Sequence, residues 1–167
     1  MNEILAGQRV PDVTFHVRAG DAWTEVTTAE IFNRRTVVLF ALPGAFTPTC
    51  SSRHLPGYEA LADELKAHGV DAIVCLAVND SFVMNAWRAD QGIEHITFLP
   101  DGNGEFTAAL GMTADRRAHG FGHRSRRYSM LVRDGVIAQV FAEERGPDGV
   151  ETYGVSAAEQ MLAHLAG

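Results

Sequence analysis

The sequence predicts a single α/β domain, with a mixed central sheet and helices on both of its faces. First, short apolar runs alternate with segments of helical periodicity, which is typical of parallel strands joined by helices. Second, two runs of strand-forming residues flank Asp134-Gly135, a strong signal for an antiparallel hairpin. Third, the 167 residues are 46% hydrophobic, which suits one compact core spanning residues 1–167.

The predicted elements follow one another without a repeat or a long linker. The runs "TVVLFAL" (36–42) and "VDAIVCLAV" (70–78) are continuous and apolar, as expected of strands buried on both faces. A helix is predicted over 58–69, where two leucines recur at helical spacing before a glycine. The other predicted elements are a helix over 80–92, a strand over 95–101, a short helix over 104–112, a hairpin over 127–143 and a closing helix over 156–167, capped by Ser156 with Glu159 three residues on. This size and order predict a thioredoxin-like fold.

Charge and composition limit the partners and the compartment. The net charge of −7 argues against nucleic acid or an anionic membrane as a partner, because either needs a basic surface. The one basic cluster, "HRSRRYS" (123–129), is too short to change this. No apolar run is long enough for a transmembrane helix, and the start of the chain does not resemble a secretory signal. Two cysteines do not make a disulfide framework, so we expect a cytoplasmic protein with free thiols.

The turn "PGAFTPTC" (43–50) lies at the end of the first buried strand, where sheets of this kind gather their ligand sites. Thr47 and Pro48 are typical of a helix cap and first helical residue. Cys50 then falls in the first turn, where backbone N–H groups and the helix dipole favour a thiolate. A helix terminus contributes only about 0.3–1 kcal/mol, so a nearby cation is needed as well. The arginines of "HRSRRYS" are the predicted source.

Three other roles for Cys50 fit the surrounding residues less well. A buried filler does not require two prolines and a helix cap around it. A thioredoxin-type dithiol is excluded because Ser52 and Arg53 stand where a second cysteine would be. A hydrolase would need a general base. His54 lies on the same helical face, but no residue is seen to orient its ring, and Pro56 disturbs the helix beyond.

Two further groups are interpreted as non-catalytic. Cys75 lies in the middle of a buried strand, so we expect it to be structural. His119 and His123 are separated by two glycines and lack a completing ligand, so no metal is expected, and no cofactor either.

Pro43, Thr47 and Cys50 reproduce the P-x-x-x-T-x-x-C motif, so the chain resembles the peroxiredoxins, thiol-dependent peroxidases with a thioredoxin fold. "HLPG", "CLAVND" and "RSRRYSMLV" are similar to the type II members. The resemblance implies that the Cys50 thiolate attacks a peroxide and becomes a sulfenic acid. It also implies that Thr47 holds the peroxide, that Pro43 shields the sulfur, and that Arg127 stabilises the developing charge. Backbone N–H groups at Gly44 and Cys50 would add donors, and Arg124 would support Arg127 or replace it.

The resemblance also bears on how the sulfenic acid is reduced. Relatives that resolve it themselves carry a late cysteine in the stretch matching "VETYGVSAAE" (150–159), but this chain has none after Cys75. It therefore implies a single-cysteine enzyme reduced by glutathione with glutaredoxin, or alternatively by thioredoxin. A homodimer is also implied, with Phe46 and Phe82 near its contact. The competing hypothesis from another class is a peroxide sensor or redox-regulated binding protein that uses the same thiolate.

Overall fold

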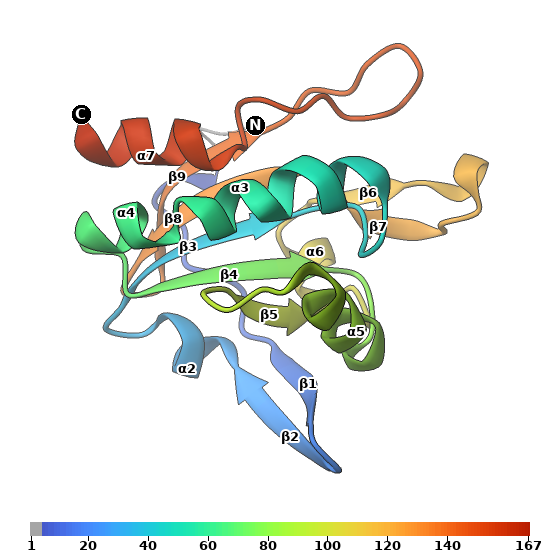
Figure 1. The fold of residues 1–167 in the computed structure, drawn as a ribbon, viewed down its shortest axis with the longest axis horizontal. Helices are drawn as coiled ribbons and strands as arrows, with labels where there is room; N and C mark the ends of the chain where they lie inside the picture. The colour runs from blue at the N-terminus through green and yellow to red at the C-terminus, as the bar shows by residue number, and fades with distance from the viewer. Residues whose placement is uncertain (1–4) are drawn as a thin grey trace.

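A five-stranded mixed sheet forms the centre of the molecule (Figure 1). The structure is a computed structural model, and it describes residues 5–167. The strand order is β5 (Thr97–Pro100), β4 (Ala72–Ala77), β3 (Thr36–Ala41), β8 (Tyr128–Arg133) and β9 (Val136–Ala142). Strands β3, β4 and β5 run parallel, whereas β8 is antiparallel to both β3 and β9. The predicted mixed sheet is confirmed.

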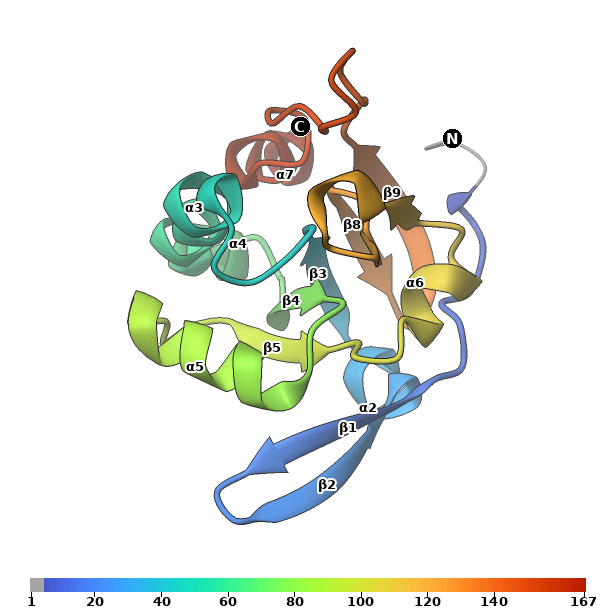
Figure 2. The same ribbon diagram turned by 90° about the vertical axis from the view of Figure 1, so that its right-hand side faces the viewer.

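Strand β3 shows why both faces of the sheet are covered. Its side chains alternate, with Val38 and Phe40 in one hydrophobic cluster and Val37 and Leu39 in the other. The first cluster is completed by α3 (Leu55–Ala60), α4 (Ala62–Ala67), α5 (Ser81–Gln91) and α7 (Ala158–Ala166), and the second by α2 (Thr28–Phe32) and α6 (Glu105–Ala109). Figure 2 shows these two helical layers on opposite sides of the sheet.

Two small hairpins lie outside the central sheet. Strands β1 (Thr14–Ala19) and β2 (Ala22–Thr27) form one, and β6 (Thr113–Asp115) and β7 (His123–Ser125) form the other. A short 3₁₀ turn, η2 (Arg117–His119), lies between β6 and β7. None of these elements was predicted. The β6–β7 hairpin matters most here, because it carries an arginine to the functional site.

The predicted hairpin around Asp134-Gly135 is confirmed. Both residues have positive φ, 48° and 76°, as a type I′ turn requires. This turn joins β8 to β9 and thereby adds the antiparallel half of the sheet.

Two sequence predictions need correction. The single helix over 58–69 is in fact two, because the backbone at Leu61 leaves the helical region (φ −100°, ψ 9°). Ser156 is not the cap of the last helix, since Ala157 occupies that position without a side-chain bond. The buried Ser156 instead donates through its backbone N and its Oγ to the carboxylate of Glu143. No helix within residues 5–167 is long and apolar enough to cross a bilayer.

Candidate active site

The turn that follows β3 carries the candidate nucleophile. The helix begins at Pro48, as predicted, and Cys50 lies in its first turn. The turn is fixed to the neighbouring strand end, because Ala45 N donates to Asn79 Oδ1 at 3.0 Å. Phe46 has φ 63°, an outlier for an aromatic residue and a sign that the surrounding structure imposes this conformation.

The helix opens with a wide turn. Residues Cys50–His54 form the π-helical segment η1, in which Leu55 N donates to the carbonyl of Cys50. Pro56 follows in the first turn of α3 and has no backbone N–H to donate. The wide turn therefore ends next to a position where a regular α-helix would lack one backbone hydrogen bond. Such π turns are frequent at functional sites. Cys50 and His54 are both buried.

The pairing of β3 with β8 brings an arginine to the sulfur. Ala41, the last residue of β3, pairs with Tyr128, the first residue of β8, so Arg127 lies at the same edge as Cys50. Arg127 Nη2 donates to Cys50 Sγ at 3.3 Å. The sulfur is fully buried and Arg127 is 5% exposed, so water screens this contact little. Of the two arginines considered from the sequence, the structure brings Arg127, not Arg124, to Cys50.

His54 holds the other end of the same guanidinium. Its Nδ1 accepts from Arg127 Nη1 at 2.9 Å, and its Nε2 donates to the Ser156 carbonyl at 3.2 Å. An arginine only donates and a carbonyl only accepts, so these partners define a neutral ring protonated at Nε2. Burial, and then the charge of Arg127, lower the pKa of His54 to about 3. With both nitrogens engaged away from the sulfur, the ring is not placed as a general base, which removes the support for a hydrolase.

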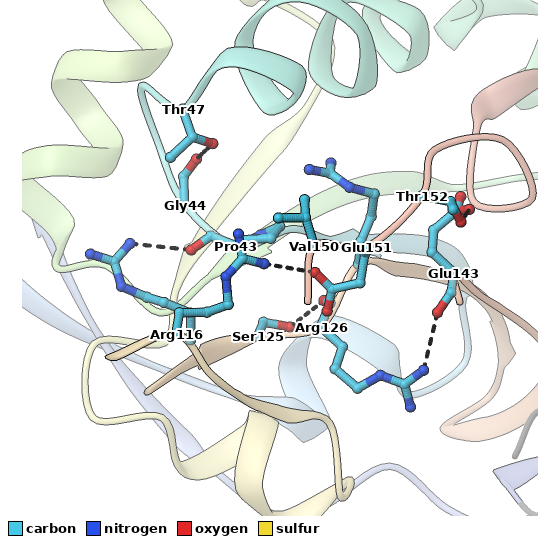
Figure 3. Close-up of polar contacts among 12 residues, drawn as sticks. Pro43, Gly44, Thr47, Arg116, Ser125, Arg126, Glu143, Val150, Glu151 and Thr152 are labelled. Atoms are coloured by element: carbon cyan, nitrogen blue, oxygen red, sulfur yellow. Dashed lines mark hydrogen bonds and ion pairs between the residues drawn. The ribbon is translucent and has the colours of Figure 1, made fainter. Parts of the chain in front are cut away.

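The buried carboxylate of Glu143 positions the segment that contacts His54. Glu143 follows β9, and its carboxylate accepts from the backbone N of Gly154 (2.8 Å) and Ser156 (2.7 Å) and from two hydroxyls. These bonds fold the chain after β9 so that the Ser156 carbonyl faces His54. Figure 3 shows the backbone carbonyl of Glu143, which accepts from Arg126 Nη2 at 3.1 Å. No local sequence pattern predicts this role of Glu143.

The remaining predicted site residues lie together in the turn itself. Pro43 and Gly44 are buried and Thr47 is half-buried. The Thr47 hydroxyl donates to the Gly44 carbonyl at 2.7 Å (Figure 3). The Pro43 carbonyl accepts from Arg124 Nη1 at 3.1 Å. Arg124 therefore contacts the backbone of the turn, whereas Arg127 contacts the sulfur.

Cys75 has the environment of a core residue. It lies on β4, opposite Phe40 of β3, and is fully buried and unpaired. Burial, together with the nearby Cys50, raises the pKa of the Cys75 thiol. A thiol of this kind reacts slowly. Among residues 5–167, no group of three or more His, Cys, Asp or Glu side chains is placed to hold a metal ion.

A thioredoxin-like sheet that presents a buried cysteine to an arginine defines a thiol-based redox protein. Comparison with known proteins identifies the family within this class. The family model described as Redoxin matches residues 5–162. The chain is 53% identical over 162 residues to "Hybrid peroxiredoxin hyPrx5" of Haemophilus influenzae, covering 97% of this chain but only 66% of that protein. It is 49% identical over 174 residues to "Peroxiredoxin sll1621" of Synechocystis, covering 98% and 92%.

The structural comparison agrees. Reduced Prx3 from Vibrio vulnificus, solved in complex with H₂O₂, superposes with a TM-score of 0.88 at 45% identity, covering 96% of this chain and 98% of that one. The chain belongs to the redoxin family and is a peroxiredoxin, a peroxidase of the oxidoreductase class.

Proposed function

We propose that Cys50 is the peroxidatic cysteine and reduces hydrogen peroxide and alkyl hydroperoxides. The contact between Arg127 Nη2 and Cys50 Sγ carries this proposal. The thiolate attacks one peroxide oxygen and the O–O bond breaks. The sulfur becomes a sulfenic acid, and the departing oxygen leaves as water or an alcohol once it takes up a proton. The fixed positive charge of Arg127 stabilises the negative charge that develops on that oxygen.

The turn supplies the rest of the site in this proposal. The Thr47 hydroxyl and the backbone N–H groups of Gly44 and Cys50 hold the peroxide, while Pro43 keeps water from the sulfur. The position of these residues in one turn beside Cys50 supports this assignment. So does the Vibrio relative, which binds H₂O₂ and shares 45% of its sequence with this chain.

The test is peroxide consumption by two matched cysteine variants. Cys50→Ser is expected to abolish turnover, because a hydroxyl at this position is not ionised at neutral pH. Cys75→Ser, which changes the second buried cysteine, is expected to retain it. Activity that survives in Cys50→Ser would contradict the proposal. A protein that consumes one equivalent of peroxide and then stops, even with a thiol present, would be a sensor.

An external thiol reduces the sulfenic acid in this proposal. The chain has no cysteine beyond Cys75, and Cys75 is buried in the sheet. Glutathione attacks the sulfenic sulfur and releases water. The resulting mixed disulfide is then reduced by a second thiol, from glutaredoxin. The alternative external reductant is thioredoxin, acting in place of glutathione and glutaredoxin. A reducing compartment such as the cytoplasm suits this chemistry.

Mass spectrometry after one equivalent of peroxide and excess glutathione checks the reduction route. We expect glutathione attached at Cys50 as the main product. An internal Cys50–Cys75 disulfide as the main product would overturn the route without affecting the assignment of Cys50.

We also propose a homodimer that covers an exposed aromatic surface. Phe46 and Phe82 are 53% and 59% exposed, and Phe82 packs edge-on against Trp23, itself 54% exposed. Exposed apolar patches of this kind are typical of protein contacts. Sedimentation at micromolar concentration should give a dimer, and Phe82→Glu should shift it toward monomer. A monomeric wild-type protein would exclude the contact.

A further inference from the structure

Arg124 makes one contact with the active-site turn and two with Phe121 of its own hairpin. It lies on β7, and its Nη1 donates to the Pro43 carbonyl at 3.1 Å. Its Nε donates to the Phe121 carbonyl at 3.0 Å, and the guanidinium carbon lies 5.2 Å from the centre of the Phe121 ring. The guanidinium is therefore fixed in place rather than extended into solvent.

The space that this guanidinium fills explains the glycine beside it. A Cβ added to Gly44 would lie 2.5 Å from Arg124 Nη1, closer than real contacts allow. Gly44 does not have a positive φ, so the position requires space rather than backbone freedom. Its carbonyl also accepts the hydrogen bond of the Thr47 hydroxyl at 2.7 Å. The location of the Pro43-Gly44 backbone thus sets where that hydroxyl lies.

The hairpin that carries Arg124 is itself anchored. The Phe121 ring also lies 5.9 Å from the guanidinium carbon of Arg116. Arg116 Nη1 pairs with Glu151 Oε2 at 2.8 Å, and both side chains are almost fully buried (Figure 3). Glu151 belongs to the segment between β9 and α7. The hairpin that carries Arg124 is therefore held in place by an ion pair with a distant part of the chain.

We propose that Arg124 is a positioning residue of the peroxide site. It holds the Pro43-Gly44 turn, and through Gly44 the Thr47 hydroxyl, in register with Cys50. The inference rests on the proposed function. Arg124 bonds backbone oxygens and Arg127 bonds the sulfur, so the two arginines have separable roles. Loss of Arg124 should misplace the peroxide while leaving the cation beside the thiolate in position.

Two measurements on Arg124→Gln test this separation. The second-order rate of Cys50 oxidation by hydrogen peroxide should fall by about 10-fold or more, because small misplacements of reacting groups reduce rates by up to ~100-fold. The pH midpoint of the ultraviolet thiolate absorbance of Cys50, recorded in a Cys75→Ser background, should stay as in the parent. Gly44→Ala should likewise lower the rate of Cys50 oxidation and leave the thiolate midpoint unchanged. Arg124→Lys, which keeps one charged donor group, should recover part of the rate.

The matched control is Arg117→Gln, which removes an exposed arginine from the same β6–β7 segment and should change neither measurement. An unchanged peroxide rate in Arg124→Gln would overturn the proposal. So would a loss of rate accompanied by a shifted thiolate midpoint, which would mean that Arg124 acts through the sulfur. If Arg124→Gln does not fold, Arg124→Lys and Gly44→Ala carry the same comparison. Parent protein in which peroxide does not oxidise Cys50 would instead refute the proposed function.

Discussion

Replacing Arg127 by glutamine is expected to slow Cys50 oxidation by hydrogen peroxide by about 100-fold or more. The guanidinium donates to the sulfur at 3.3 Å in a buried site, where no other donor to Sγ is seen among residues 5–167. Removing one preorganised donor to a developing charge costs about 100- to 1,000-fold in rate in comparable sites. Stopped-flow measurement of the second-order rate constant checks this result.

Arg127→Lys keeps the charge but lacks the two separate nitrogens with which the guanidinium reaches Cys50 and His54, so it should recover only part of the rate. Arg133→Gln is the matched control, since Arg133 lies exposed at the far end of β8. An unchanged rate in Arg127→Gln would exclude this residue from the chemistry.

The buried His54 should make the protein lose stability as the pH falls. Burial, and then the charge of Arg127, lower the pKa of His54 from 6.5 to about 3. Between these pH values the unfolded chain binds a proton that the folded protein does not, so the free energy of unfolding falls as the pH is lowered. The contribution is complete above pH about 6.5 and is lost as the pH approaches about 3. Its full size is of the order of 5 kcal/mol.

Urea unfolding across this pH range, with His54→Gln beside wild type, measures the contribution. Glutamine retains an acceptor for Arg127 and a donor for Ser156 but does not titrate. The pH dependence should therefore be clearly shallower in the variant. His95→Gln is the control. The hydrogen bond to Glu59 raises the pKa of the exposed His95. The contribution of His95 to the free energy of unfolding therefore has the opposite sign and is lost as the pH rises. Equal slopes in wild type and His54→Gln would show that His54 does not remain neutral in the folded protein.

Local chemistry made the central sheet predictable. The continuous apolar runs of β3 and β4 require burial on both faces, and Asp134-Gly135 adopts the positive φ values that its composition favours. The β1–β2 hairpin was missed although Gly20-Asp21 is itself a hairpin signal. The cap prediction for Ser156 is wrong because its hydroxyl donates to the buried carboxylate of Glu143 and does not cap the helix. Sequence spacing does not reveal this long-range contact.

The candidate nucleophile could be predicted from the sequence, but the residues that position its partners could not. Cys50 stood out because the proline, threonine and helix start around it are local features. The partners of His54 are Arg127 and Ser156, which lie 73 and 102 residues away in the chain. Only the register of β8 on β3 and the fold of the segment after β9 bring them together. The π-helical turn was likewise invisible, because Pro56 indicated only that regular helical bonding is interrupted.

The distance along the chain between the sulfur and its cation has a consequence for biosynthesis. Cys50 is translated 77 residues before Arg127, and the two meet only when β8 has paired with β3. Until then the thiol is that of an ordinary unfolded peptide, mostly protonated at neutral pH. A growing chain on the ribosome therefore carries the Cys50 thiol without its cation, and the buried contact between Cys50 and Arg127 forms only in the folded protein.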